Sequence, residues 1–318
     1  MALIGQPAAL ASQAGILRSY SPMNSALGLA ENTGTGSKLP DDMSGYLAAG
    51  YINGSSLPMP AAASSGRDKF DGWFAAAGVE QAVSDNTTLG IGAYYSNLSG
   101  ETGGAPQKAN AWLFQLNLYG AISNGNGMRV DARLGLGLHE SSSDRTVTLV
   151  GAPYALHFKD DGFAFSGEVG IGFDLAHKSN LSIVPRASMR FGRLGMSGGF
   201  ETGGPMALAI QRQDQEALEG RLGFSLSTKN ASSVRPFFEA NYVHDFADQP
   251  TSFLAGFAGG PAVAPFALTP SDNDWGELSG GIAINLGKTA EVALEADTTV
   301  MRDDFRNQSY RARISFRF

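Results

Sequence analysis

The feature that most constrains the fold of this chain is a strict alternation of apolar and polar residues in short segments. Residues 128–141 show it most clearly. Alternate positions there carry Val130, Ala132, Leu134, Leu136 and Leu138, and the positions between them carry Arg129, Asp131, Arg133 and His139 together with glycines. Successive side chains of a β-strand point to opposite faces. The segment therefore predicts a strand with one apolar face and one polar face.

The same alternation recurs along the chain and predicts an all-β fold. The alternating segments are separated by clusters of Gly, Asn, Asp and Ser, which are typical of turns. We expect twelve strands, at residues 45–53, 70–83, 89–97, 111–123, 128–141, 163–176, 181–193, 218–228, 234–246, 275–286, 291–300 and 309–318. No apolar run reaches the roughly 18 residues that a membrane-spanning helix needs.

The lengths of the connections decide between two all-β architectures. Alternation alone fits a soluble β-sandwich, whose inner face is apolar and whose outer face is polar. Here, however, short and long connections alternate. The short ones are residues 84–87, 124–127, 177–180, 229–233 and 287–290, and the long ones include 100–110, 142–161, 194–217 and 247–274. Tight turns on one side and long loops on the other indicate a twelve-stranded antiparallel transmembrane β-barrel.

Composition excludes several other classes of protein. Charged residues make up only 17% of the 318 residues and 41 residues are Gly, which suits a sheet with one wet face better than a helical enzyme. The absence of Cys excludes disulfides, thiolate metal sites and cysteine nucleophiles. A net charge of −7 argues against nucleic acid as a partner. The N-terminus shows no signal peptide, so if the protein is exported we expect this chain to be a fragment or a processed piece.

The polar faces of the expected strands predict a lumen lined by charge. Three arginines on the last strand would repel one another unless acids faced them across the lumen. The expected lumen-lining residues are Arg129, Asp131, Arg133, Glu168, Asp174, Arg186, Arg190, Glu219, Arg221, Arg235, Glu239, Glu295, Asp297, Arg311, Arg313 and Arg317. We therefore expect a polar lumen and a lipid-facing exterior.

The C-terminal segment carries a resemblance to a known family. In residues 309–318 the lipid-facing positions include Tyr310, Ile314, Phe316 and Phe318, and this pattern resembles the C-terminal signal read by the barrel-assembly machinery of the bacterial outer membrane. The twelve strands, the alanine-rich segment before them and residues 72–95 look like the translocator domain of autotransporters.

This resemblance implies a translocator and anchor in the outer membrane of a Gram-negative bacterium, which moves or displays an N-terminal passenger. The implied partners are outer-membrane lipid, lipopolysaccharide, the assembly machinery and the chain's own passenger segment, and the barrel is expected to be a monomer. The resemblance implies neither an enzyme nor a cofactor.

Residues 1–40 are expected to form a linker, and residues 41–318 the barrel. In autotransporters a helix lies inside the barrel, and residues 7–29 can supply it. Pro7 suits a first helical position, and the alanines that follow favour a helix and fit a narrow lumen. The alternative is a flexible linker, which the Gly, Ser and Asn content of residues 24–40 supports.

Several motifs could carry chemistry, and each is weak. Residues 195–199 match the G-x-S-x-G pattern around Ser197, but a Gly-rich loop follows instead of a helix. His139 with Ser141 resembles the pair of a barrel phospholipase, although here His139 shares the face of the arginines. His244 with Asp245, opposite Asp303 and Asp304, could mimic a surface protease. Asn32 after Glu31 is a conceivable self-cleavage position. We therefore expect no catalytic site and no metal site.

Two rivals remain open besides the translocator. One is a barrel enzyme of the phospholipase or protease type, and the other is a porin or adhesin-type barrel whose long apolar loop, residues 247–274, folds over the mouth. Aromatic residues near the strand ends are expected to form girdles at the membrane interfaces. They are Trp73, Trp112, Trp275, Tyr94, Tyr95, Tyr119 and Tyr242.

Overall fold

The computed structural model describes residues 43–57, 66–102, 107–176, 180–228, 233–247, 252–260, 263–268, 270–287 and 290–317. Every regular element in these ranges is a β-strand, and none of the described segments forms a helix long and apolar enough to cross a membrane. The expected helix at residues 7–29 and the linker at residues 1–40 lie outside the described ranges.

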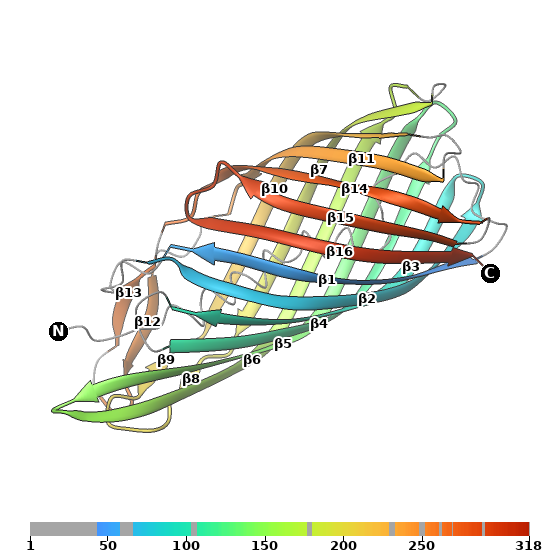
Figure 1. Ribbon diagram of the computed structural model, residues 1–318. Helices are drawn as coiled ribbons and strands as arrows, with labels where there is room; N and C mark the ends of the chain where they lie inside the picture. Colours follow the sequence, from blue (N-terminus) through green and yellow to red (C-terminus); the bar gives the residue numbers. More distant parts are fainter. Residues whose placement is uncertain are drawn as a thin grey trace.

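Twelve strands close into one antiparallel barrel (Figure 1), as the alternation predicts. They are β1 (Met43–Ser56), β2 (Asp68–Ser84), β3 (Thr87–Glu101), β4 (Gln107–Ser123), β5 (Met128–Leu149), β6 (Ala152–Phe173), β7 (Leu181–Met196), β10 (Gln213–Thr228), β11 (Val234–Asp245), β14 (Asp274–Leu286), β15 (Ala290–Val300) and β16 (Phe305–Arg317). Apart from the closing pair of β1 and β16, each barrel strand pairs with the barrel strands that come before and after it in the sequence. The barrel closes where β1 pairs with β16, from Ser44 opposite Arg317 to Ser56 opposite Phe305.

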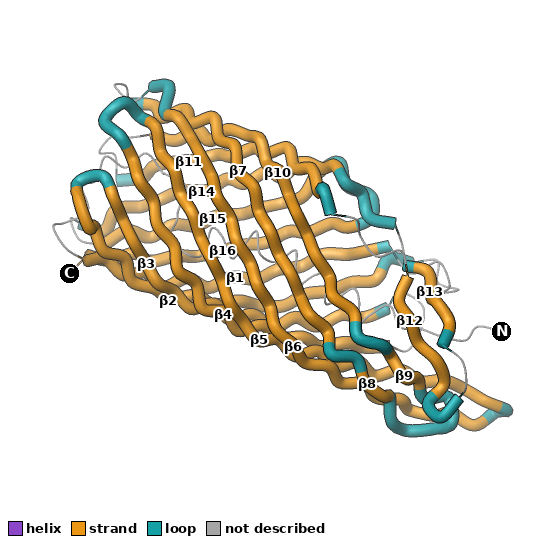
Figure 2. The backbone as a smooth tube through the Cα atoms, turned by 180° about the vertical axis from the view of Figure 1, so that it is seen from behind, coloured by secondary structure: helices purple, strands orange, loops and turns teal. Residues whose placement is uncertain are grey.

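The outside of the barrel carries an apolar band with a sharp upper edge. On β5 the outward side chains Leu134, Leu136 and Leu138 are exposed, and the next outward positions above them are Glu140 and Ser142. On β6 the same change falls between Phe163 and Asp161. An exposed apolar band of this kind requires a hydrocarbon surrounding. The strands in Figure 2 run obliquely along the barrel, as closure of a barrel demands.

Three expected loops contain strands instead. Residues 142–161 are not a loop, because β5 and β6 stay paired up to Leu149 opposite Ala152 and form a hairpin that rises beyond the apolar band. Residues 194–217 and 247–274 contain four short strands, β8 (Gly199–Phe200), β9 (Leu208–Ile210), β12 (Ser252–Phe257) and β13 (Ala264–Ala267), which form a separate sheet in the order β13-β12-β9-β8. This sheet lies at the same end as the raised hairpin (Figure 1).

The hairpin and the small sheet form what we call the outer lobe, comprising residues 141–161, 195–212, 252–260 and 263–268. Its core contains Phe158, Met196, Leu208, Ile210 and Ala255. The buried Arg145 guanidinium donates to both carboxylate oxygens of Glu201, at 2.7 and 2.5 Å. The long loops are therefore folded against one another, which the alternation of short and long connections did not predict.

The expected aromatic girdles are only partly correct. Trp73, Tyr95 and Trp112 point outward and contact one another, with ring centroids 5.2 and 6.5 Å apart, and Tyr242 is also exposed. In contrast, Tyr94, Tyr119 and Trp275 are buried and face inward. Trp275 lies beneath the guanidinium of Arg302, whose carbon is 3.8 Å from the ring centroid. Position near a strand end did not determine which way the ring points.

Candidate functional site

The lumen of the barrel is the candidate functional site, and one of its walls is a connected network of ion pairs. At its centre the Glu168 carboxylate contacts Arg133 at 3.0 Å, Arg190 at 3.3 Å and Arg186 at 3.5 Å. Arg186 also holds both oxygens of Asp131, at 2.9 and 2.7 Å. These side chains lie on β5, β6 and β7.

The network continues around the barrel onto β10 and β14. Arg190 contacts Glu219 at 3.3 Å, Glu219 contacts Arg221 at 3.4 Å, and Arg221 pairs with Glu277. Both Glu168 and Glu219 lie between two or more arginines. Opposite charges held together in this way offset the cost of taking each charge out of water.

A second group of pairs closes the wall from β11 to β16. The Arg311 guanidinium contacts Glu295 at 2.5 Å and Asp297 at 3.9 Å. Glu291 pairs with Arg235 and lies 3.8 Å from Arg313. We call all these inward-facing side chains of β5–β7, β10, β11 and β14–β16 the charged wall. Glu277 and Glu291 were missing from the sequence-based set, although both occupy inward positions of their strands and could have been found from that parity.

The remaining sequence-predicted residues lie as follows. Arg129 lines a pocket with Asp131, Arg186, Glu239 and Asn241 near the short-turn end of the barrel. Glu239 accepts the Asn241 side-chain amide. Asp174 is buried and accepts the backbone N–H of Ala176 at 3.0 Å. The side chain of Arg317 and the whole of Phe318 lie outside the described part of the chain. Tyr310 and Ile314 point outward and are exposed.

The inward faces of β1–β4 carry a cluster of apolar side chains beside buried polar ones such as Ser96, Gln115 and Asn117, so the expectation of a polar lumen is only partly correct there. We call the buried inward-facing apolar side chains of β1–β4 the apolar wall. They are Tyr46, Ala48, Ile52, Phe70, Phe74, Ala76, Tyr94, Leu98, Ala111, Leu113 and Tyr119, and Ala164, Leu194 and Phe305 join the same cluster. Rings stack within it, Phe70 on Phe305 at 5.1 Å and Phe74 on Tyr94 at 5.9 Å.

The closed strand order places the two walls face to face. In the sequence of neighbours β1-β2-β3-β4-β5-β6-β7-β10-β11-β14-β15-β16, the strand farthest from β1 is β7 and the strand farthest from β2 is β10. The lumen therefore has an apolar side on β1–β4, which faces the charged side chains of β7 and β10 across the lumen and adjoins the charged wall at the β4–β5 and β1–β16 pairs.

The candidate catalytic residues do not assemble into a site. The Ser197 hydroxyl donates to the Asp161 carbonyl at 2.8 Å, and the Asp160 carboxylate accepts the Ser197 N–H at 3.0 Å. His139 is buried, with Nε2 2.8 Å from the Gly195 carbonyl oxygen. These contacts hold the turn after β7 and leave no exposed nucleophile next to His139 among the residues that the structure describes.

The second candidate group is also dispersed. The His244 Nδ1 lies 2.7 Å from Asp274 on the outer surface, away from Asp245. Asp304 pairs with Arg302 at 2.7 Å, and Asp272 accepts the N–H groups of Asp303 and Asp304. These N–H groups lower the pKa of Asp272. The expected acidic couple opposite His244 is thus part of a rim turn, and Asn32 lies outside the described ranges.

Burial raises the pKa of Asp160 to about 6, despite the backbone N–H groups that it accepts. Asp160 lies above the apolar band, where the neighbouring outward residues are Lys159 and Asp161. Within the described ranges there is no cluster of three His, Cys, Asp or Glu side chains that could hold a metal ion.

Known proteins match this chain over most of the barrel. Residues 59–297 match the model of the autotransporter β-domain. The translocator domain of the autotransporter NalP from Neisseria meningitidis is similar in structure, with a TM-score of 0.72, 13% identity, and coverage of 97% of this chain and 95% of that one. The β-domain of the Bordetella autotransporter BrkA gives a TM-score of 0.62 at 16% identity, over 87% and 100% of the two chains.

A barrel from outside that group is also similar. The Pseudomonas putida toluene transporter TodX gives a TM-score of 0.56 at 10% identity, over 89% of this chain and 91% of that one. At these identities the structural matches speak for the fold alone. The comparison with curated proteins finds no match.

Proposed function

The chain belongs to the autotransporter β-domain family, and from this we propose that it lies in the outer membrane of a Gram-negative bacterium and there moves or displays its own N-terminal passenger segment. It is a translocator and a membrane anchor. The observation that carries the proposal is the combination of a closed barrel, an apolar outer band and a lumen whose charges are paired within the wall.

Each of these features has a physical role in anchoring and transport. Closure pairs every strand on both sides, so no unpaired edge meets lipid. The charged wall pairs its acids and arginines internally, so a passing segment is not held by unpaired lumenal charges. We propose that the barrel itself performs no catalysis, because His139 and Ser197 are engaged by backbone carbonyls.

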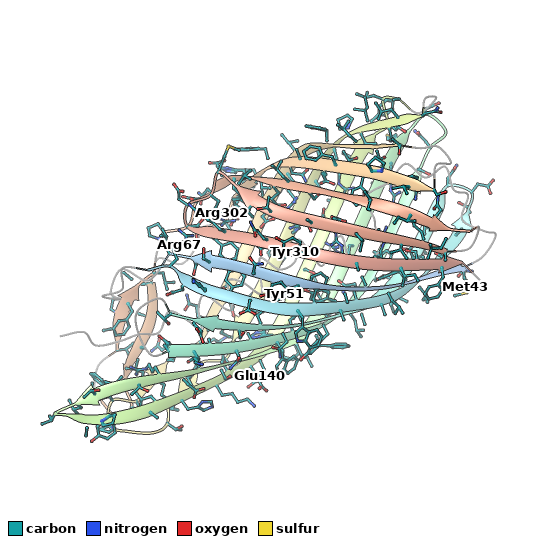
Figure 3. All side chains as sticks on the ribbon, viewed as in Figure 1. Met43, Tyr51, Arg67, Glu140, Arg302 and Tyr310 are labelled. Carbon is teal, nitrogen blue, oxygen red and sulfur yellow. The ribbon has the colours of Figure 1, made fainter. Side chains whose placement is uncertain are left out.

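The partners we propose are lipid and lipopolysaccharide around the apolar band, the barrel-assembly machinery at the C-terminal strand, and the passenger segment in the lumen. Tyr310 supports the second of these, since it points outward beside Tyr51 at the closing seam (Figure 3).

The test compares the full chain with a variant lacking residues 1–40. A folded barrel migrates faster on an unboiled detergent gel than after boiling, and both proteins are expected to show this shift. Deletion is expected to raise single-channel conductance in a planar bilayer. A tag before Met1 is expected to be cleaved by protease added to whole cells. Absence of the heat shift contradicts the barrel, and an inaccessible tag contradicts surface display.

One observation favours a second function, the passage of apolar small molecules. The apolar wall gives this lumen a surface that such solutes could follow, and a toluene transporter shares the fold. The test measures uptake of toluene into vesicles that contain the full chain and into control vesicles that contain a porin instead. Faster uptake with the full chain would support this function.

A further inference from the structure

The outer surface of the barrel carries a row of basic side chains across the closing seam, beyond the apolar band. Arg306 on β16 lies opposite Ser55 on β1, and Ser55 lies opposite Lys69 on β2. These positions have the same outward parity as the exposed rings Tyr310 and Tyr51, which lie nearer the middle of the strands (Figure 3). The row lies about 13 Å along the strands beyond these rings. It is therefore at the outer rim and faces the surroundings of the barrel.

Arg67 adds a second guanidinium to this row. Its Nε donates to the Ser55 hydroxyl at 2.9 Å, and its Nη1 donates to the Asp303 carbonyl oxygen at 2.8 Å. Both acceptors are neutral oxygens, so neither cancels the charge. Partial burial and the neighbouring positive charge of Arg306 lower the pKa of Arg67. We call Arg67, Lys69 and Arg306 the basic seam.

The basic seam differs from the rest of the outer surface in how its charges are paired. Beyond the band on other strands, basic side chains contact carboxylates. These pairs include Lys108 with Glu101 at 3.3 Å, Lys159 with Glu140 at 2.9 Å, and Arg193 with Asp214. In the basic seam, the one ion pair among the described residues joins Arg306 to Asp303 at 4.0 Å, and the Asp303 side chain is 94% exposed. The seam therefore presents positive charge to a ligand.

A strip of aromatic side chains lies between the basic seam and the middle of the apolar band. Tyr51, Trp73 and Tyr310 are exposed on adjacent strands, and Trp73 contacts Tyr95 with ring centroids 5.2 Å apart. Asp71 lies between the strip and the seam, where its carboxylate accepts the Tyr51 hydroxyl at 3.2 Å. Aromatic rings of membrane proteins gather at the level of the lipid headgroups. The basic side chains beyond them therefore lie where lipid phosphates are found.

We propose that the basic seam binds the phosphate groups of a lipopolysaccharide molecule, whose acyl chains lie against the aromatic strip and the apolar band. The inference rests on the proposed function, which places lipopolysaccharide around the barrel, and it adds the strands that hold the headgroup. Guanidinium groups suit phosphate because they donate two parallel hydrogen bonds to its oxygens. Each basic side chain near an anionic lipid surface adds to the attraction. The headgroup thus bridges β16, β1 and β2 across the closing seam.

Two double variants test the site. Lys69→Gln with Arg306→Gln removes two charges from the basic seam and keeps Arg67, which also holds the rim backbone. Lys108→Gln with Lys159→Gln is the matched control, because it removes the same charge beyond the band, where both lysines have carboxylate partners. Binding to each full-length chain in detergent micelles is measured by native mass spectrometry. The probes are lipid A with two phosphates, dephosphorylated lipid A with the same acyl chains, and inorganic phosphate.

We expect the natural chain to bind phosphorylated lipid A ~10-fold or more tightly than the dephosphorylated lipid, and the seam variant to lose ~10-fold or more of that affinity. The control variant is expected to lose less than ~3-fold, since exposed paired charges contribute little. Equal losses in the two variants, or equal binding of the two lipids by the natural chain, overturn the site. Binding of inorganic phosphate as tight as that of phosphorylated lipid A overturns a lipid as the ligand.

Folding and display are scored on the same proteins. Loss of the heat-shifted band or of the protease-accessible tag in the natural chain reports failure of the proposed translocator, whereas their retention with equal losses in the two variants reports failure of the lipid site alone. If the seam variant lacks the heat-shifted band, Lys69→Gln is compared with Lys108→Gln, because both side chains are exposed. Lys69→Gln is expected to weaken binding of phosphorylated lipid A ~3-fold or more relative to Lys108→Gln, and equal binding by these two overturns the site.

Discussion

Removing the charge of Glu168 should destabilise the barrel more than any single change to an exposed ion pair. Three guanidinium groups surround this carboxylate at 3.0, 3.3 and 3.5 Å. At an effective dielectric constant of ~20 each contact corresponds to ~5 kcal/mol of Coulomb attraction, most of which is offset by the cost of desolvating the charges. In Glu168→Gln, Arg186 keeps Asp131 and Arg190 keeps Glu219, but Arg133 loses its contact with a carboxylate.

Loss of one partner from a buried pair costs ~3–5 kcal/mol. We expect Glu168→Gln to lower the free energy of unfolding by about 3 kcal/mol, measured by urea unfolding in lipid vesicles with tryptophan fluorescence and the heat-shifted band as probes. Glu101→Gln is the matched control, because Glu101 pairs with Lys108 at 3.3 Å while both side chains are largely exposed, and such pairs contribute ~0–1 kcal/mol.

The double variant with Arg133→Leu separates the charge network from simple loss of shape. If the isolated guanidinium causes the loss, the second change should restore part of the stability, since the uncompensated charge is gone. A Glu168→Gln variant that unfolds within ~1 kcal/mol of Glu101→Gln would refute the stabilising role of the charged wall.

Three further outcomes are expected. Leu136 lies in the middle of the apolar band with 67% of its surface exposed, so Leu136→Arg should lower the free energy of unfolding by ~2–4 kcal/mol. Ser142→Arg, above the band, should lower it by less than ~1 kcal/mol. Equal losses in the two variants would contradict this position of the band. Asp160 binds its proton more tightly when folded, because its pKa rises from 3.8 to about 6, so the outer lobe should lose stability as the pH rises from 4 to 6. Asp160→Asn should remove this dependence of stability on pH. Hydrogen exchange of residues 195–201, corrected for intrinsic rates, measures it. A variant with the same pH profile as the natural protein would contradict the role of Asp160. Arg145→Met should open the outer lobe to protease within residues 194–217 while the heat-shifted band persists, because it leaves Glu201 buried without its arginine; resistance equal to the natural protein would show that the pair is dispensable.

The strands could be predicted from sequence because the barrel is built from local alternation. On β5 the apolar and charged positions separate cleanly, and the structure pairs that strand along its whole predicted length. The outer lobe could not be predicted in the same way. Strands β8 and β9 have two and three residues, too few to show a period. Their stabilising pair, Arg145 with Glu201, joins residues 56 positions apart.

The sidedness of the lumen was missed for a different reason. In residues 73–77 the sequence Trp-Phe-Ala-Ala-Ala is apolar at every position, so alternation carries no information about which face meets lipid. The polar lumen was predicted from the polar faces of strands such as β5, and the same was assumed for β2. A continuous apolar run in a strand instead indicates that both faces are buried in apolar surroundings, and Phe74 and Ala76 are indeed buried in the lumen.

An up-and-down barrel converts order along the chain into position around the lumen. Because each strand pairs with its neighbours in the sequence of barrel strands, a change in the inward residues from apolar in β1–β4 to charged in β5–β7 becomes a difference between two opposite walls. In a Greek-key sheet the same composition would be interleaved, since sequence neighbours need not be spatial neighbours. The lumen's asymmetry is therefore encoded in the order of its strands. Moving the Arg133–Glu168 pair to inward positions of β2–β3 should therefore weaken this asymmetry without abolishing it, because the other ion pairs stay on β5–β16. The strand pairing that closes the barrel is made by the backbone and does not depend on which inward side chains are charged.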